Sequence, residues 1–130
     1  MTPLVVTLLV AVHLAGTIWH GGAHETLAIG LSPAQNLFVY VVILLAPLIA
    51  AGLVWTRYVT AALWLFTLSM LGALLFGVYH HYILVSPDNV AHLPPGTPHD
   101  HAQFIRSAAT IAVLELLSAV YGAYCLRPRV

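Results

Sequence analysis

The protein has 130 residues, of which 61% are hydrophobic and only 6% are charged. A soluble domain has about 45–50% apolar and about 25% charged residues, so four basic and four acidic side chains are too few for a soluble surface. This excludes a soluble enzyme and a disordered tail. The zero formal net charge and the lack of lysine exclude a nucleic-acid-binding protein, which needs a basic face. The chain nevertheless has eight histidines, as many as all its charged residues together.

Four long apolar segments follow one another along the chain. Each is close to the ~20 residues that span a ~30 Å hydrocarbon layer, and backbone groups in lipid must be satisfied internally, which makes such segments helices. The first segment lacks the basic region and the clean cleavage site of a signal peptide, so we interpret it as a span. The sequence predicts an all-α integral membrane protein, a single domain over residues 1–130 forming an antiparallel four-transmembrane-helix bundle. The expected helices cover about residues 3–20, 35–55, 59–81 and 103–125.

Local signals at the expected helix ends agree with these segments. The sequence from Ser32 to Gln35 has the pattern of a capping box with proline at the first helical position, so it should open the second helix. Asp100, with Gln103 three residues later, is expected to open the fourth helix in the same way. The short connection around Arg57 predicts that the second and third helices form an antiparallel hairpin.

The arginines predict the orientation in the membrane. Arg57 lies between the second and third helices, and Arg127 and Arg129 follow the fourth, so with four spans all three share one side with the N-terminus. Arg106 alone falls on the opposite side. Because arginine accumulates in cytoplasmic segments, we expect a multi-pass cell-membrane protein with both termini cytoplasmic and histidine-rich loops outside. Its main partner is then the lipid bilayer, and a second membrane protein or another copy of the chain remains open.

The first expected helix has histidines at metal-ligand spacing. His13, His20 and His24 are seven and four residues apart, and at about 100° per residue they share one helix face. This requires the helix to continue through the two glycines between His20 and His24, although paired glycines often end a helix. Spacing of four residues suits two ligands to one ion, and Glu25 is a further candidate ligand. The string does not match the metalloprotease signatures.

A depth argument pairs His13 with Glu115. If His20 and Ser107 mark the same outer boundary, His13 lies about 10 Å and Glu115 about 12 Å below it by helical rise. Ionisable groups at this depth are costly in contact with lipid, so both should face the bundle interior. Small residues around Glu115 indicate close helix packing. We therefore expect the two side chains to meet, either as part of a functional site or as a structural hydrogen bond.

The third expected helix ends with two consecutive histidines. His80 and His81 point about 100° apart, so at most one of them faces the bundle axis. The first and third helices are diagonal in an up-and-down bundle, so this histidine should meet His20 at the outer end. The other histidines are as compatible with a polar loop as with a metal site; they are His92, His99 and His101.

These residues define a predicted site with several possible ligands. Imidazole and carboxylate without thiolate favour copper(II) or zinc, which predicts metal handling or membrane redox chemistry. One alternative is a b-type haem held by His20 and His80 or His81, in a membrane electron-transfer protein. Another is a non-catalytic accessory subunit of a larger membrane complex, and enzymatic activity is left open. The expected metal ligands are His13, His20, His24, Glu25, His80, His81 and Glu115.

Overall fold

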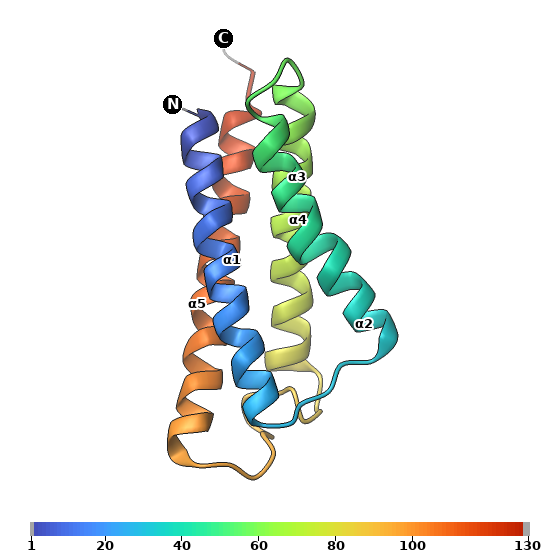
Figure 1. The fold of residues 1–130 in the computed structure, drawn as a ribbon, viewed down its shortest axis with the longest axis vertical. Helices are drawn as coiled ribbons and strands as arrows, with labels where there is room; N and C mark the ends of the chain where they lie inside the picture. Colours follow the sequence, from blue (N-terminus) through green and yellow to red (C-terminus); the bar gives the residue numbers. More distant parts are fainter. Residues whose placement is uncertain (1, 129–130) are drawn as a thin grey trace.

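The computed structural model describes residues 2–128 and is all-helical within them (Figure 1). Four helices in this part of the chain are long and apolar enough to span a membrane. The second and third are each divided by a change of helix type. The elements are α1 (Thr2–Thr26); α2 (Pro33–Phe38), the π-helical η1 (Val39–Leu45) and α3 (Ala46–Leu53); α4 (Val59–Val78) and the π-helical η2 (Tyr79–Ile83); and α5 (Pro98–Cys125).

The helices form an antiparallel bundle. α5 packs against both α1 and α4, and α3 packs against α4 and less extensively against α1. The first and third helices are therefore diagonal, as expected. Both chain ends and the α3–α4 turn lie at the upper end in Figure 1, while α2 and η1 lean away from α1 toward the lower end. Arg57 and Arg127 thus share one end of the molecule, and Arg129 lies outside the described residues.

Capping side chains set the beginnings of the second and fourth helices. The predicted capping box is confirmed at α2, where Gln35 N donates to Ser32 Oγ (3.2 Å) and Ser32 N donates to Gln35 Oε1 (2.7 Å). The predicted start of the fourth helix is wrong. Thr97 forms the box instead, with Asp100 N at 3.2 Å from its Oγ1 and with its own N at 2.9 Å from Asp100 Oδ2. Pro98 at the first helical position completes this earlier start.

The first helix continues past its expected end near residue 20 and reaches Thr26. Its two consecutive glycines stay helical because the next turn contributes to the core. Ala23 and Leu27 are buried in an apolar cluster with Phe104 of α5. Burial of this turn outweighs the modest cost of two glycines in a helix, about 1 kcal/mol each.

A Schellman motif ends α1. Ile29 N donates to the carbonyl of His24 (2.9 Å), and Ala28 N donates to the carbonyl of Glu25 (3.1 Å). Ala28 occupies the left-handed position with φ 53°, a conformation that usually selects glycine. The motif turns the chain sharply and places the carbonyl of Ile29 beside the His24 ring.

Two π-helical segments lie in the half of the bundle that carries the histidines. η1 ends where Ala46 N donates to the carbonyl of Val41, just before Pro47. Proline has no backbone N–H to donate, which accounts for the widened turn preceding it. η2 ends with Leu84 N donating to the carbonyl of Tyr79 (2.8 Å). Single π turns within α-helices are frequent at functional sites.

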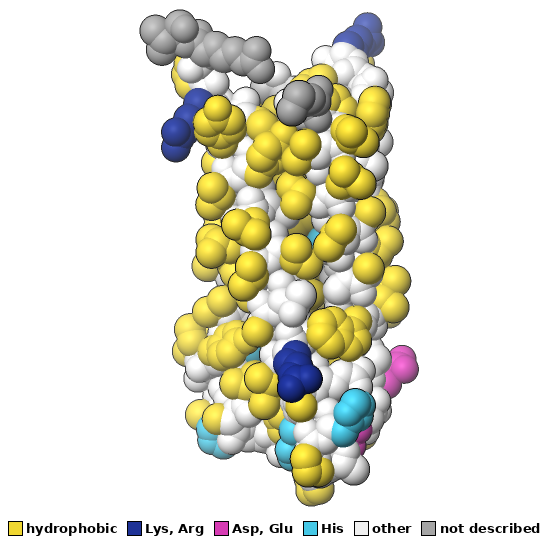
Figure 2. All heavy atoms as spheres, turned by 90° about the vertical axis from the view of Figure 1, so that its left-hand side faces the viewer, with side chains coloured by type: hydrophobic (Ala, Val, Ile, Leu, Met, Phe, Trp, Pro, Cys, Tyr) yellow, Lys and Arg dark blue, Asp and Glu magenta, His cyan; other side chains and the backbone are white. Residues whose placement is uncertain are grey.

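The two ends of the bundle interior differ: an apolar cluster lies near the chain ends, and the buried imidazoles of His20 and His81 lie toward the other end. Val6, Val10, Phe66 and Met70 belong to a closely packed cluster between α1 and α4 near the chain ends. Figure 2 shows hydrophobic side chains over the sides of the molecule, with histidines gathered at its lower end. Such an outer surface suits a hydrocarbon environment.

Candidate metal centre

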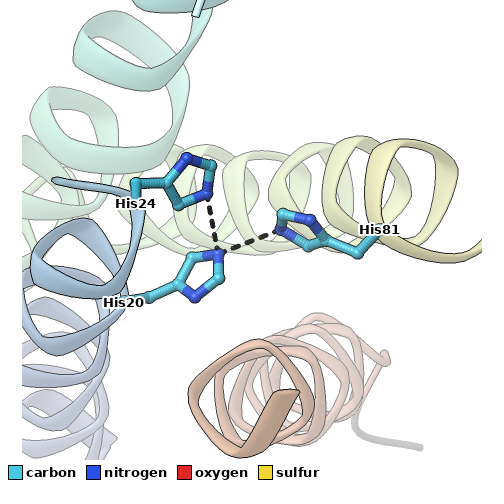
Figure 3. Close-up of side chains that lie close together, drawn as sticks. All are labelled: His20, His24 and His81. Atoms are coloured by element: carbon cyan, nitrogen blue, oxygen red, sulfur yellow. Dashed lines mark hydrogen bonds between the residues drawn. The ribbon is translucent and has the colours of Figure 1, made fainter. Parts of the chain in front are cut away.

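Three histidines from two helices point toward one another (Figure 3). His20 and His24 lie on α1, and His81 lies on η2. The Nε2 atom of His20 is 3.1 Å from that of His81 and 3.2 Å from that of His24. An ion bound tetrahedrally at 2.0–2.1 Å separates its nitrogen ligands by about 3.3 Å. The two nitrogen–nitrogen distances therefore match those around a single metal ion.

The partners of His20 determine which of its nitrogens faces the cluster as an acceptor. Its Nδ1 lies 2.8 Å from Ser107 Oγ. The Ser107 hydroxyl donates to the carbonyl of Phe104 (3.0 Å), so its oxygen accepts a hydrogen bond from His20 Nδ1. We therefore assign the ring proton of His20 to Nδ1, which leaves the lone pair of Nε2 directed at the other two histidines.

The other two rings are held in the same way. His81 Nδ1 donates to the backbone carbonyl of Asp88 (3.0 Å), and His24 Nδ1 faces the carbonyl of Ile29 at 3.4 Å. Three Nε2 lone pairs consequently converge. Histidines that bind metals typically donate the other ring N–H to a carbonyl, carboxylate or hydroxyl group, which fixes the tautomer and the ring orientation.

A buried carboxylate lies beside the cluster. Asp88 is only 6% exposed, and its Oδ1 is 3.1 Å from His81 Nδ1 and 3.2 Å from His24 Nε2. Among the described residues neither of its carboxylate oxygens has a hydrogen bond of good geometry. A buried carboxylate beside neutral imidazoles is costly, and a cation held by the imidazoles would compensate its charge.

The sequence reasoning missed Asp88. It lies in the connection after η2, and the chain returns to the site because Val90 N donates to the carbonyl of His81 (2.9 Å). One feature of the sequence could have indicated it: Asp88 is one of only four acidic residues and follows His81 by seven positions. Helical periodicity cannot place a residue that lies in a loop.

The ring of Phe104 covers one side of the histidine cluster. The Phe104 ring lies against all three histidines, with centroid distances of 4.9 Å to His20, 5.1 Å to His24 and 5.5 Å to His81. Phe104 is itself fully buried. It restricts the imidazole rotamers and keeps water from one side of the cluster, which strengthens electrostatic interactions there.

The structure brings only some of the predicted residues into this cluster. His81 joins it, whereas the neighbouring His80 packs on Phe76 with a centroid distance of 4.4 Å and accepts a hydrogen bond from Gln35 Nε2 at 3.3 Å. This agrees with the expectation that one histidine of the pair faces the axis. Glu25 is exposed beside the cluster, and the three ligand atoms within 4.8 Å of one another come from the histidines alone.

The expected pairing of His13 with Glu115 is present deeper in the bundle. His13 Nε2 on α1 lies 3.1 Å from Glu115 Oε1 on α5. The two residues are 1% and 2% exposed, respectively. Ionisable groups so deep in an apolar bundle are retained only when they have partners, and here each is the partner of the other.

A cavity joins the histidine cluster to Glu115. It has a volume of about 530 Å³ and lies between α1, η1, α4 and α5. Its lining combines ionisable groups with apolar side chains. The ionisable residues are His20, His24, Glu25, His81, Asp88 and Glu115, and the apolar ones include Val39, Ile43, Ala73, Phe76 and Ile111.

The remaining histidines have local roles. His101 Nε2 donates to the carbonyl of Pro94 (2.9 Å), and His92 Nδ1 lies 3.4 Å from Asn89 Oδ1. His99 is exposed in the first turn of α5. These contacts stabilise the long connection before α5.

Comparison of the chain with protein-family models, curated protein sequences and solved structures finds no match. The site is therefore interpreted from its own chemistry. Three oriented imidazoles form a group that could hold a metal ion, and a buried carboxylate beside them favours positive charge.

Proposed function

We propose that this protein is a small polytopic membrane protein that binds copper or zinc through His20, His24 and His81. One observation carries the proposal. His20 Nε2 lies 3.1 Å from His81 Nε2 and 3.2 Å from His24 Nε2, the three ligand atoms lie within 4.8 Å of one another, and each Nδ1 faces a hydrogen-bond acceptor. Facing acceptor nitrogens, such as His20 Nε2 and His81 Nε2 at 3.1 Å, repel each other unless a cation or a proton lies between them.

The ligand set indicates what kind of site this is. Neutral imidazole suits both zinc and copper, and the absence of thiolate in the cluster argues against sites for copper(I). The carboxylate of Asp88 supplies negative charge beside the cluster, and the three histidines are the proposed protein ligands. Structural zinc sites normally have four protein ligands, whereas sites with three keep a position open for exchange or chemistry. The proposed role is metal handling or membrane redox chemistry.

The packing of the bundle half near the chain ends favours a metal site that is open only toward the other end of the bundle. Val6, Val10, Phe66 and Met70 fill the interior between the metal site and the chain ends. An ion cannot cross such a cluster without a large desolvation cost. We therefore propose binding and delivery from one end of the bundle, with His13 and Glu115 as the deepest polar pair, rather than conduction through it.

The haem alternative has less support. Axial haem ligation needs two opposed nitrogens with space for a macrocycle between them, whereas His20 Nε2 and His81 Nε2 are 3.1 Å apart. His80, the other candidate axial ligand, faces Gln35 instead. The contact distances among the rings therefore favour an ion.

Metal analysis of the purified protein tests the proposal. After loading with copper or zinc and removal of excess metal, elemental analysis should give one ion per chain. Replacing His20 by Ala should lower metal affinity at least about tenfold, because it removes a ligand, and His99→Ala should not. Less than stoichiometric metal in the wild-type protein, or equal affinity in His20→Ala, would contradict the proposal. A Soret band would indicate haem instead.

We also propose that the metal site faces away from the cytoplasm. In a Cys125→Ser background, a cysteine introduced at exposed Pro95 should react with a membrane-impermeant maleimide in intact cells. A cysteine at Thr56, in the α3–α4 turn, should react only after lysis. The reversed pattern would place the histidine cluster on the cytoplasmic side and refute the orientation derived from the arginines.

A further inference from the structure

The cavity beside the three histidines is larger than a metal site needs. A single ion occupies the space between its ligand atoms, whereas a volume of about 530 Å³ falls in the range of about 300–1,000 Å³ typical of sites for organic molecules. Its lining contains the proposed metal ligands and Glu115 together with apolar side chains from η1, α4 and α5. This combination suits a ligand with one polar end and an apolar body.

Gly77 lies beside both His81 and Glu115 in the cavity lining. A Cβ at this position would lie 3.8 Å from His81 Cδ2 and 4.0 Å from Glu115 Oε2, both ordinary contact distances. Packing therefore does not require glycine here, although glycine within a helix costs about 0.5–1 kcal/mol relative to alanine. Its missing side chain leaves room for a small group that touches both the metal site and the carboxylate.

Glu115 presents one oxygen to this space. Its Oε1 is engaged with His13 at 3.1 Å, and its Oε2 lies 4.0 Å from the position that a Cβ at Gly77 would take. The residue is 2% exposed and lines the cavity. A buried carboxylate oxygen directed at a cavity is a hydrogen-bond acceptor for a ligand hydroxyl.

The cavity reaches the side of the bundle. It lies where α2 and η1 lean away from α1 (Figure 1), and Tyr40 of η1, which lines it, is 63% exposed. Both π-helical segments border it, η1 through Tyr40 and Ile43 and η2 through His81. A molecule dissolved in the hydrocarbon layer thus has a lateral route to the metal.

We propose that this cavity binds a lipid-soluble alcohol or phenol, whose hydroxyl oxygen occupies the open coordination position of the metal and hydrogen-bonds to Glu115. The apolar body lies along Ile43, Ala73 and Phe76. The inference rests on the proposed metal centre. Among the described residues lining the cavity none is arginine, and the sequence has no lysine, so a phospholipid phosphate would find no cationic partner. A neutral head group is therefore favoured.

Cobalt-loaded protein provides the test, because the visible absorption of cobalt(II) changes with its ligands. Metal content is measured first, without ligand. Titration with para-heptylphenol should then give a saturable spectral change, and heptylbenzene, which lacks the hydroxyl, should give none. Full cobalt occupancy without a change on adding the phenol would overturn the inference and leave the metal proposal standing. Absence of bound cobalt would overturn the metal proposal itself.

Variants that fill the cavity locate the ligand. Gly77→Leu should weaken the apparent affinity for para-heptylphenol at least about tenfold with unchanged metal content. Gly52→Leu is the matched control, because nothing lies within 4 Å of a Cβ at Gly52. If Gly77→Leu disturbs His81 and lowers metal content, the variant Ile43→Trp, which fills the cavity from η1, is used to test the ligand position instead. Wild-type phenol affinity in metal-loaded Ile43→Trp would then refute the assignment, as would wild-type affinity in metal-loaded Gly77→Leu.

Discussion

The buried pair His13–Glu115 predicts a measurable coupling between α1 and α5. Replacing either residue by alanine leaves its partner unpaired in an apolar interior. The pair is 3.1 Å apart and at most 2% exposed. Hydrogen bonds involving charged groups contribute about 1.5–3 kcal/mol in soluble proteins, but double-mutant cycles within a membrane protein average about 0.6 and reach about 1.7 kcal/mol. We expect a coupling free energy of about 1–2 kcal/mol.

A double-mutant cycle on the free energy of unfolding in detergent measures this value. It compares wild type, His13→Ala, Glu115→Ala and the double variant. Glu115→Gln keeps the shape and a hydrogen-bonding group, so it should lose less stability than Glu115→Ala. Additivity of the two alanine variants within about 0.5 kcal/mol would show that the side chains do not interact. The depth argument that pairs them would then be refuted.

Three further changes test other parts of the structure. Asp88→Ala should weaken metal affinity by about 10–100-fold, because the cluster loses the negative charge beside it; competition with a chelator measures this, and an unchanged affinity would exclude the role. Ala28→Gly should raise the free energy of unfolding by about 1 kcal/mol by relieving a left-handed conformation, and a destabilised variant would contradict this. Gly122→Ala should destabilise by about 1–3 kcal/mol in the same assay, because its Cβ would meet Thr67 Oγ1; Gly52→Ala, with open space around its Cβ, is the control.

Much of the fold follows from the sequence because each segment contains its own evidence. The four apolar segments predict the helices by length, and the capping box at Ser32 places the start of the second. The His13–Glu115 contact was also predictable, since helical rise is nearly constant and equal depth is a strong constraint in an apolar bundle. Whether the bundle lies in a membrane stays a prediction.

The features that sequence reasoning missed, left open or got wrong depend on contacts between distant segments. The first helix passes its glycines because Ala23 and Leu27 pack with Phe104, a residue about eighty positions away along the chain. Asp88 lies in a loop, where helical periodicity cannot predict which side chains reach the site. The π turns of η2 influence whether His80 or His81 faces the axis, and a two-residue pattern cannot distinguish them.

The packing of the second helix has a consequence for local unfolding. α3 packs on α4, whereas η1 and α2 have fewer neighbours toward the histidine end. Backbone amides of η1 should therefore exchange with solvent deuterium faster than those of α3, although both belong to one apolar span. The three histidines lie on α1 and η2, outside this segment. The second helix can thus fluctuate open beside the cavity while the three imidazoles keep their mutual geometry.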